Sequence, residues 1–256
     1  EDGEYAEKSA GNYNRINNDA MISLGHTTGD RQYFEYAARN LRMMLTYIEP
    51  DGNIFTGNST RWDNGLKIYP TDYYTEYLEM GIELDIPEFL DMANYIFSLV
   101  EEKHMEAPDQ LIHYMNHPQW IEREHTGLWK QTPYNRFYKE SGIARVHRQG
   151  FTYTVMKEKT GFLHLSTESM ELLLKLGGGY FEHRGFQAKS MDKAPDGSFH
   201  LEQTMEGWYY LPFKEKQDTS DWWKMENQKR EKVMGPDLHL QADIREIEDG
   251  VEVCLK

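Results

Sequence analysis

Cysteine is nearly absent from this chain, since Cys254 is the one thiol in 256 residues. A single cysteine excludes disulfides within the chain, but it leaves the redox compartment open because many secreted bacterial enzymes also lack cysteine. Long apolar runs are missing as well, so no stretch has the length of a membrane-spanning segment, and we expect no membrane partner. Positive charge is scarce too: 28 Lys and Arg face 43 Asp and Glu, a formal net charge of −15.

The charge is uneven along the chain. Residues 1–130 carry 23 acidic and 10 basic side chains, a net of −13, whereas the remaining residues carry 20 and 18, a net of −2. An acidic surface repels polyanions at long range. We therefore expect no nucleic acid as a partner, and any anionic polysaccharide would have to meet a local group of cations. The simpler interpretation of the acidic half is a solvated face that favours solubility.

A signal peptide is not visible either. The sequence opens inside a motif and closes on 251–256, which reads as an unfinished strand. We therefore expect a piece of a longer parent chain, whose own compartment stays open. A secreted or periplasmic bacterial parent is one option.

The period of the apolar residues changes along the chain. Helical spacing in the first half predicts two helical hairpins, with helices at about 12–25, 31–48, 73–84 and 87–100. Residues 104–136 show no clear period and are interpreted as a linker. From Ser141 the period becomes two, which predicts a meander of about eight antiparallel strands, at 143–148, 151–156, 162–165, 170–176, 185–191, 199–205, 238–247 and 251–255. The fold class is α+β and multidomain, with a helical domain at 1–136 and an antiparallel, incomplete β-sandwich at 137–256.

The most distinctive stretch is the polar beginning of the chain. Tyr13 falls at the start of the first helix, and Glu7, Asn12 and Arg15 are its neighbours in sequence. A cation and hydrogen-bond donors can stabilise a phenolate, which would make a general base of a group whose reference pKa is about 10. The alternative is a half-buried tyrosine that anchors the helix start.

A family resemblance adds to this interpretation. The pattern Asp2-Gly3-x-x-x-Glu7-x-Ser9-x-x-x-Tyr13 resembles the signature of heparinase II/III-type polysaccharide lyases, and the resemblance spans most of the chain. It implies part of an α/α toroid followed by a β-sandwich. It also implies that Tyr13 serves as base, acid or both in β-elimination from a uronic-acid polysaccharide or oligosaccharide.

The chain departs from the family pattern in two places. The upstream toroid helices, which carry an asparagine or histidine that neutralises the substrate carboxylate, have no counterpart. The His-x-His-x-Asp stretch near the start of the sandwich is also absent, and 150–154 stand about where it is expected.

A loop at residues 56–65 is the second candidate site. In toroid lyases an arginine on a loop one hairpin after the tyrosine contributes to the site, so the resemblance places Arg61 there. Arg61 could bind a carboxylate in a bidentate manner, Trp62 could stack on a sugar, and Asn58 could donate to a developing enolate. The alternative is a capped loop between two helices.

The glycine-rich stretch 177–185 in the second half is a third candidate. It suggests a bulge and not a phosphate loop, because no Gly-Lys-Ser/Thr follows. The resemblance reaches this stretch, so His183 could act as neutraliser or proton shuttle and Arg184 could bind substrate. The alternative is a surface histidine at a bulge.

Three functions remain open. The first is a polysaccharide lyase with Tyr13, Arg61 and His183 as catalytic residues and Asn58, Trp62, Glu7 and Arg184 as substrate-binding residues, without a cofactor. The second is a glycoside hydrolase that pairs Glu7 with Asp63 or Asp72. The third is a noncatalytic carbohydrate-binding or scaffold piece.

We expect no metal requirement. Four histidines cluster at His104, His113, His117 and His125, but their spacing fits no compact zinc pattern and the single thiol is distant in sequence. Addition of a chelator should leave the melting temperature unchanged in differential scanning fluorimetry. A chelator-induced drop in melting temperature that added zinc reverses would contradict this prediction.

Overall fold

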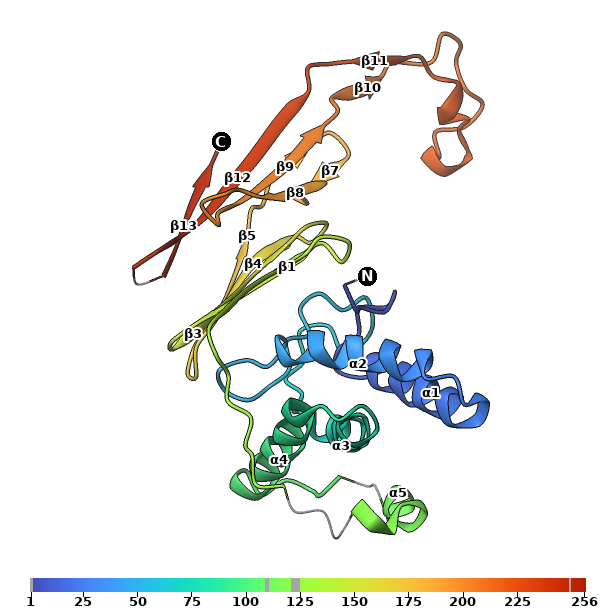
Figure 1. Cartoon of the computed structure of the whole chain (residues 1–256). Helices are drawn as coiled ribbons and strands as arrows, with labels where there is room; N and C mark the ends of the chain where they lie inside the picture. The colour runs from blue at the N-terminus through green and yellow to red at the C-terminus, as the bar shows by residue number, and fades with distance from the viewer. Residues whose placement is uncertain (1, 109–110, 121–124, 249) are drawn as a thin grey trace. The chain divides into compact units, whose positions relative to one another are not determined.

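The structure is a computed structural model that describes residues 2–108, 111–120, 125–248 and 250–256. Five α-helices precede the strands in these ranges, and the paired strands run antiparallel, so the chain is α+β with helices and strands segregated (Figure 1). The helices are α1 (Tyr13–Thr28), α2 (Gln32–Leu45), α3 (Tyr74–Glu83), α4 (Pro87–Glu102) and α5 (Leu111–Asn116). Within the described ranges, no helix combines the length and the apolarity needed to cross a membrane.

The chain divides into two compact units, which are described separately. Unit 1 comprises Glu1–Met156 and Leu163–Leu173, and unit 2 comprises Lys157–Phe162 and Leu174–Lys256. The first strand begins at Tyr134, close to the predicted change from helix to strand. The division into compact units falls later in the chain than that change, because the first strands belong with the helices.

Two glycines allow the helices of each hairpin to approach closely. A Cβ on Gly25 of α1 would lie 2.4 Å from the Phe34 ring of α2, and a Cβ on Gly81 of α3 would lie 2.6 Å from the Leu90 side chain of α4. At such distances an added Cβ would force the Phe34 ring or the Leu90 side chain to shift, so glycine favours the close approach of the helices. The two predicted helical hairpins are therefore present and packed by their apolar faces.

The buried core of unit 1 joins the helices to the segment that follows α2. Its members are apolar side chains that are almost fully removed from solvent, among them Phe34, Leu41, Met44, Tyr47, Ile48, Phe55, Tyr77, Met80, Phe89, Ile96, Ile143 and Met156. Burial of each large apolar side chain contributes about 1.5–3 kcal/mol relative to exposure. The core therefore fixes the position of residues 46–68, which carry the predicted loop site.

The first sheet has five strands in sequence order. They are β1 (Tyr134–Tyr138), β2 (Ile143–Arg148), β3 (Phe151–Met156), β4 (Gly161–Ser166) and β5 (Glu171–Lys175). β2 and β3 have the bounds that the alternation predicted, whereas β1 begins inside the stretch 104–136 that was interpreted as linker and ends inside the predicted β domain. Its alternation was missed because Tyr134–Tyr138 mixes polar and aromatic residues on both faces.

Unit 2 contains a four-stranded antiparallel sheet in the order β13, β12, β9, β8 and two small ribbons, β6 with β7 and β10 with β11. Their bounds are β6 (Gly179–Tyr180), β7 (His183–Arg184), β8 (Ser190–Lys193), β9 (Phe199–Met205), β10 (Trp208–Tyr210), β11 (Lys232–Met234), β12 (Leu238–Ile247) and β13 (Gly250–Leu255). The predicted continuous strand at 185–191 is wrong. Gly185 adopts φ 72°, a left-handed conformation that interrupts the extended run, so β7 and β8 form separately.

A buried guanidinium ties the sheet of unit 1 to its helical part. Arg145 on β2 has no exposed surface. Its Nη1 donates to Glu49 Oε1 at 2.7 Å and also to the Thr154 hydroxyl, and its Nε donates to the Thr46 carbonyl oxygen at 2.8 Å. The guanidinium also lies 4.7 Å from the centroid of the Phe55 ring. A buried charge is tolerated only when it is paired and hydrogen-bonded in this way.

Removal of this charge pair should destabilise the fold strongly. We expect Arg145→Ala to lower the free energy of unfolding by about 3–5 kcal/mol, because Glu49 is left buried without its cation. Lys67 is the matched control, since its ammonium lies 3.3 Å from Asp51 but its side chain is 63% exposed. Lys67→Ala should change the free energy by no more than about 1 kcal/mol. Urea unfolding measures both variants, and equal effects would contradict the prediction.

Candidate functional site

A buried carboxylate joins the beginning of the chain to the loop at 56–65. Asp63 is fully buried. Its Oδ1 accepts hydrogen bonds from the hydroxyls of Ser9 at 2.9 Å and Ser59 at 2.5 Å, and its Oδ2 accepts one from the Gly11 amide at 2.9 Å. Hydrogen bonds to a charged acceptor contribute more than neutral ones. Asp63 therefore holds the two sequence-predicted site segments in one place.

Backbone contacts reinforce the same junction. The amide and the hydroxyl of Thr60 both donate to the Glu7 carbonyl oxygen, at 3.1 and 2.7 Å. Gly11 is required because a Cβ at this position would lie 2.9 Å from Asp63 Oδ2 and 2.6 Å from the Ile68 side chain. The spacing of Glu7, Ser9 and Gly11 thus has a structural explanation, because all three residues contact the loop at 56–65 where it packs against the beginning of the chain.

Tyr13, Arg61 and Glu7 meet at the surface of this junction. The Arg61 guanidinium carbon lies 5.4 Å from the centroid of the Tyr13 ring, within cation–π range. Arg61 Nη2 also donates to Glu7 Oε1, and the two side chains are 49% and 30% exposed. The hydrogen bond and the charge of Glu7 raise the pKa of Arg61, so this group stays cationic. The arrangement places a phenol, a guanidinium and a carboxylate on one accessible patch.

Tyr13 itself is held by the turn that precedes α1. Its backbone amide donates to the Ser9 hydroxyl at 3.2 Å, and its carbonyl oxygen accepts from the Asn17 side chain at 2.9 Å. The side chain is half-buried, as in the anchoring interpretation, and its ring faces the cation, as in the catalytic one. Both interpretations of Tyr13 therefore share the same geometry.

The other two candidates of the loop differ in exposure. Trp62 is 63% exposed, which leaves its indole free to contact a ligand. Asn58 is 3% exposed, and its amide nitrogen donates to Glu4 Oε1 at 2.6 Å and to the Tyr47 hydroxyl oxygen at 2.9 Å. Because this nitrogen is already committed, we leave Asn58 out of the groups that would contact a substrate.

Glu4 belongs to the same buried group. Its Oε1 also accepts a hydrogen bond from the Tyr47 hydroxyl at 2.9 Å. Burial raises the pKa of Glu4 and raises that of Tyr47 well above its usual range. Glu4 and Tyr47 therefore form the buried side of the junction through their hydrogen bonds with each other and with Asn58.

His183 and Arg184 lie in unit 2, where they form β7 opposite β6. His183 pairs with Tyr180, and Arg184 pairs with Gly179. His183 is half-buried and Arg184 is exposed. Tyr13, Arg61 and Glu7 belong to unit 1.

A second polar cluster, between α1 and α3, was not recognised in the sequence. Asn18 is fully buried, and its side-chain nitrogen donates to Asn40 Oδ1 at 3.0 Å and to Glu76 Oε2 at 2.9 Å. Burial, and then the nearby charge of Asp19, raise the pKa of Glu76 well above its usual range. The signal that could have found it is Asn14 and Asn18, two amides four residues apart on the α1 face that turns inward.

The histidines of the predicted linker have other partners. His125 Nε2 lies 2.6 Å from Asp91 Oδ1, and His117 stacks on Trp120 with ring centroids 4.4 Å apart. In the ranges that the structure describes, no group of three or more His, Cys, Asp or Glu could hold a metal ion.

No family model, curated protein or solved structure matches the chain in the comparisons with known proteins.

The buried Glu76 should make stability depend on pH. A carboxyl whose pKa is raised in the folded state contributes stability that is fully present below its unfolded pKa and is lost as pH rises through the folded pKa. We therefore expect the free energy of unfolding to fall as pH rises above 4.5, the ordinary pKa of the group. Glu76→Gln should reduce that fall, because the amide stays neutral and can still accept from Asn18.

Urea unfolding at a series of pH values measures this effect. Glu83→Gln on the same helix is the control, because Glu83 is only half-buried. A slope that is the same in Glu76→Gln as in the unsubstituted chain would show that Glu76 does not carry the pH dependence.

Proposed function

We propose that this chain is the part of a polysaccharide lyase that carries its general base, acting by β-elimination on a uronic-acid-containing polysaccharide. The observation that supports the proposal most is the Arg61 guanidinium lying 5.4 Å from the centroid of the Tyr13 ring. β-Elimination needs a base and a cation that offsets developing negative charge, and this patch offers both groups at an accessible surface.

The reaction is written for the residues of unit 1. The Tyr13 oxygen, as phenolate, takes the proton from the carbon next to the uronate carboxylate, and the electrons of that C–H bond form a double bond to the adjacent ring carbon. The bond from this second carbon to the glycosidic oxygen breaks, and Tyr13 returns the proton to the departing oxygen. The products are a new chain end and an unsaturated uronate, and no water is consumed.

Arg61 would offset the charge that develops on the substrate carboxylate. A guanidinium has five N–H donors, and the bond to Glu7 uses one of them in this structure. The remaining donors can bind a carboxylate at the same time. Glu7 would then hold the guanidinium in place, and the exposed Trp62 would contact a sugar ring.

The architecture that goes with this proposal is the one implied by the resemblance. The two hairpins α1–α2 and α3–α4 would be part of an α/α toroid, and the antiparallel sheets would belong to a β-sandwich. The order of helices before strands is common to the observed chain and to the architecture that the resemblance implies.

The glycoside hydrolase is less favoured by the same geometry. Asp63 is fully buried and accepts three hydrogen bonds, so it has no face toward a substrate. Glu7 is paired with Arg61. A pair of carboxyl groups that flank a scissile bond would therefore have to be Glu7 and the exposed Asp72.

Substitution of the base tests the proposal. We expect Tyr13→Phe, in the full natural chain, to keep the fold and to lose at least about a hundredfold in turnover, the scale of one general acid–base group. The measurement is the ultraviolet absorbance of the unsaturated product formed from polyuronates. Tyr69→Phe is the matched control, because Tyr69 is also half-buried and also has a cation, Lys103, 5.3 Å from its ring centroid.

Arg61→Ala should weaken both substrate binding and turnover. Full activity of Tyr13→Phe would end the lyase assignment. Release of reducing ends without an unsaturated product would favour the hydrolase, and glycan binding without turnover would favour the noncatalytic role.

A further inference from the structure

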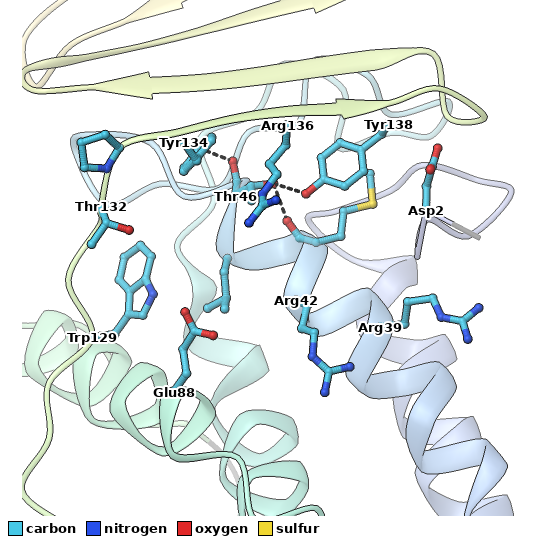
Figure 2. A pocket seen from close by; sticks show the side chains of 13 residues that line it. Asp2, Arg39, Arg42, Thr46, Glu88, Trp129, Thr132, Tyr134, Arg136 and Tyr138 are labelled. Carbon is cyan, nitrogen blue, oxygen red and sulfur yellow. Dashed lines mark hydrogen bonds between the residues drawn. The ribbon is translucent and has the colours of Figure 1, made fainter.

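A pocket in unit 1, with a volume of about 430 Å³, is lined by three arginines (Figure 2). Arg39 and Arg42 come from α2, Arg136 comes from β1, and Trp129 and Glu88 complete the side toward α4. The volume falls in the range of about 300–1,000 Å³ that is typical of small-ligand sites. Neither the predicted site residues nor the proposed reaction uses this pocket.

The wall between the arginines is fixed by hydrogen bonds. The Tyr134 hydroxyl donates to the Thr46 carbonyl oxygen at 2.7 Å, and the hydroxyls of Thr46 and Tyr138 lie 2.9 Å apart (Figure 2). Thr46 itself is buried at the end of α2. These bonds join β1 to the end of α2, so this wall of the pocket is preorganised.

The three guanidinium groups keep their donors available. Arg39, Arg42 and Arg136 are exposed, and within the described ranges none of them forms an ion pair with a carboxylate. Two of the guanidinium groups lie over aromatic rings, since the Arg42 guanidinium carbon is 5.7 Å from the Phe89 centroid and that of Arg39 is 5.8 Å from the Tyr36 centroid. Arginines that lie beside one cavity and have no carboxylate partner among the described residues are suited to bidentate binding of an oxyanion.

Two acidic groups also line the pocket. Asp2 already has a partner within the protein, because its Oδ2 accepts a hydrogen bond from the Ser141 amide at 2.9 Å. Glu88 is exposed on the first turn of α4. The pocket therefore has three cations against two anions, in a part of the chain whose overall charge is strongly negative. This local excess of positive charge is what an anionic ligand requires there.

We propose that this pocket binds the carboxylate of an acidic sugar, with Arg42 and Arg136 as its main ligands and Arg39 at the rim. Trp129, which is 8% exposed, and several hydrogen-bonding groups also line the cavity, which suits a sugar ring better than a bare ion. The choice of a uronate rests on the proposed function, whereas the affinity for an oxyanion rests on the pocket alone. A second binding subsite of this kind would hold a polyuronate at a place other than the Tyr13 patch.

Titration calorimetry tests the proposal with a dimer of galacturonic acid, a neutral dimer of galactose and sodium sulfate as separate probes. All measurements use an Arg61→Ala background, which removes the cation of the Tyr13 patch. We expect the uronate dimer to bind more tightly than either other probe. Arg42→Gln combined with Arg136→Gln should weaken that binding about tenfold or more, the scale of losing charge-assisted hydrogen bonds.

Arg31→Gln is the matched control. Arg31 directly precedes α2 and lies 6.0 Å from the Phe34 centroid, but it does not line the pocket. This substitution should leave uronate binding unchanged. The melting temperature of each variant shows that its fold is kept.

Each contrary outcome has a distinct meaning. Unchanged uronate binding in the double variant would overturn the pocket proposal even if Tyr13→Phe abolishes turnover. Equal binding of sulfate and the uronate dimer would overturn the acidic-sugar assignment and leave a plain anion site. Absence of an unsaturated product, with uronate binding still lost in the double variant, would instead defeat the lyase proposal and keep the pocket.

Discussion

Unit 1 depends on the burial of one guanidinium. Arg145 gives up all contact with solvent, a change that costs several kcal/mol unless the protein replaces the lost hydration. The replacement comes from Glu49, the Thr46 carbonyl, the Thr154 hydroxyl and the face of Phe55. These groups belong to β3 and to the chain that follows α2. The buried Arg145 charge needs partners from both the sheet and the segment after α2, and this requirement constrains how the sheet and the helical part of this unit pack together.

Tyr47 connects the buried Arg145 to the candidate site. The guanidinium of Arg145 lies 5.6 Å from the Tyr47 ring centroid, and the Tyr47 hydroxyl donates to Glu4 and accepts from Asn58. Glu4 precedes Tyr13 in the opening turn, and Asn58 precedes Arg61 in the loop. A continuous set of buried polar contacts thus runs from the sheet to both segments that present the patch. The hydrogen bonds of Glu4, Tyr47 and Asn58 limit how far the patch can move.

The sequence predicted the parts of the fold that apolar periodicity controls. The helical hairpins and the bounds of β2, β3, β9 and β12 follow from apolar spacing and from the glycines between the strands. It could not predict the burial of Asn58, Asp63 and Arg145, because each is stabilised by partners far away in the sequence. A polar loop has the same sequence pattern whether its side chains face solvent and bind a ligand or point inward and stabilise the loop. The pocket of Arg39, Arg42 and Arg136 was missed for the same reason, since α2 and β1 are about a hundred residues apart and only folding brings them together.

The location of the cations bears on how an acidic chain could recognise an acidic polymer. At physiological salt the Debye length is about 8 Å, so charges on distant parts of the surface are largely screened and the groups nearest the ligand decide its binding. The net charge of −15 would then slow the approach of a polyanion without preventing its binding at a local cationic patch. Arg61 beside Tyr13 and the three arginines of the pocket are two such patches on an otherwise acidic unit. Under the proposed function, a polymer with regularly spaced carboxylates would bind at both patches, and the linkage of two weak sites would raise its affinity without any new contact.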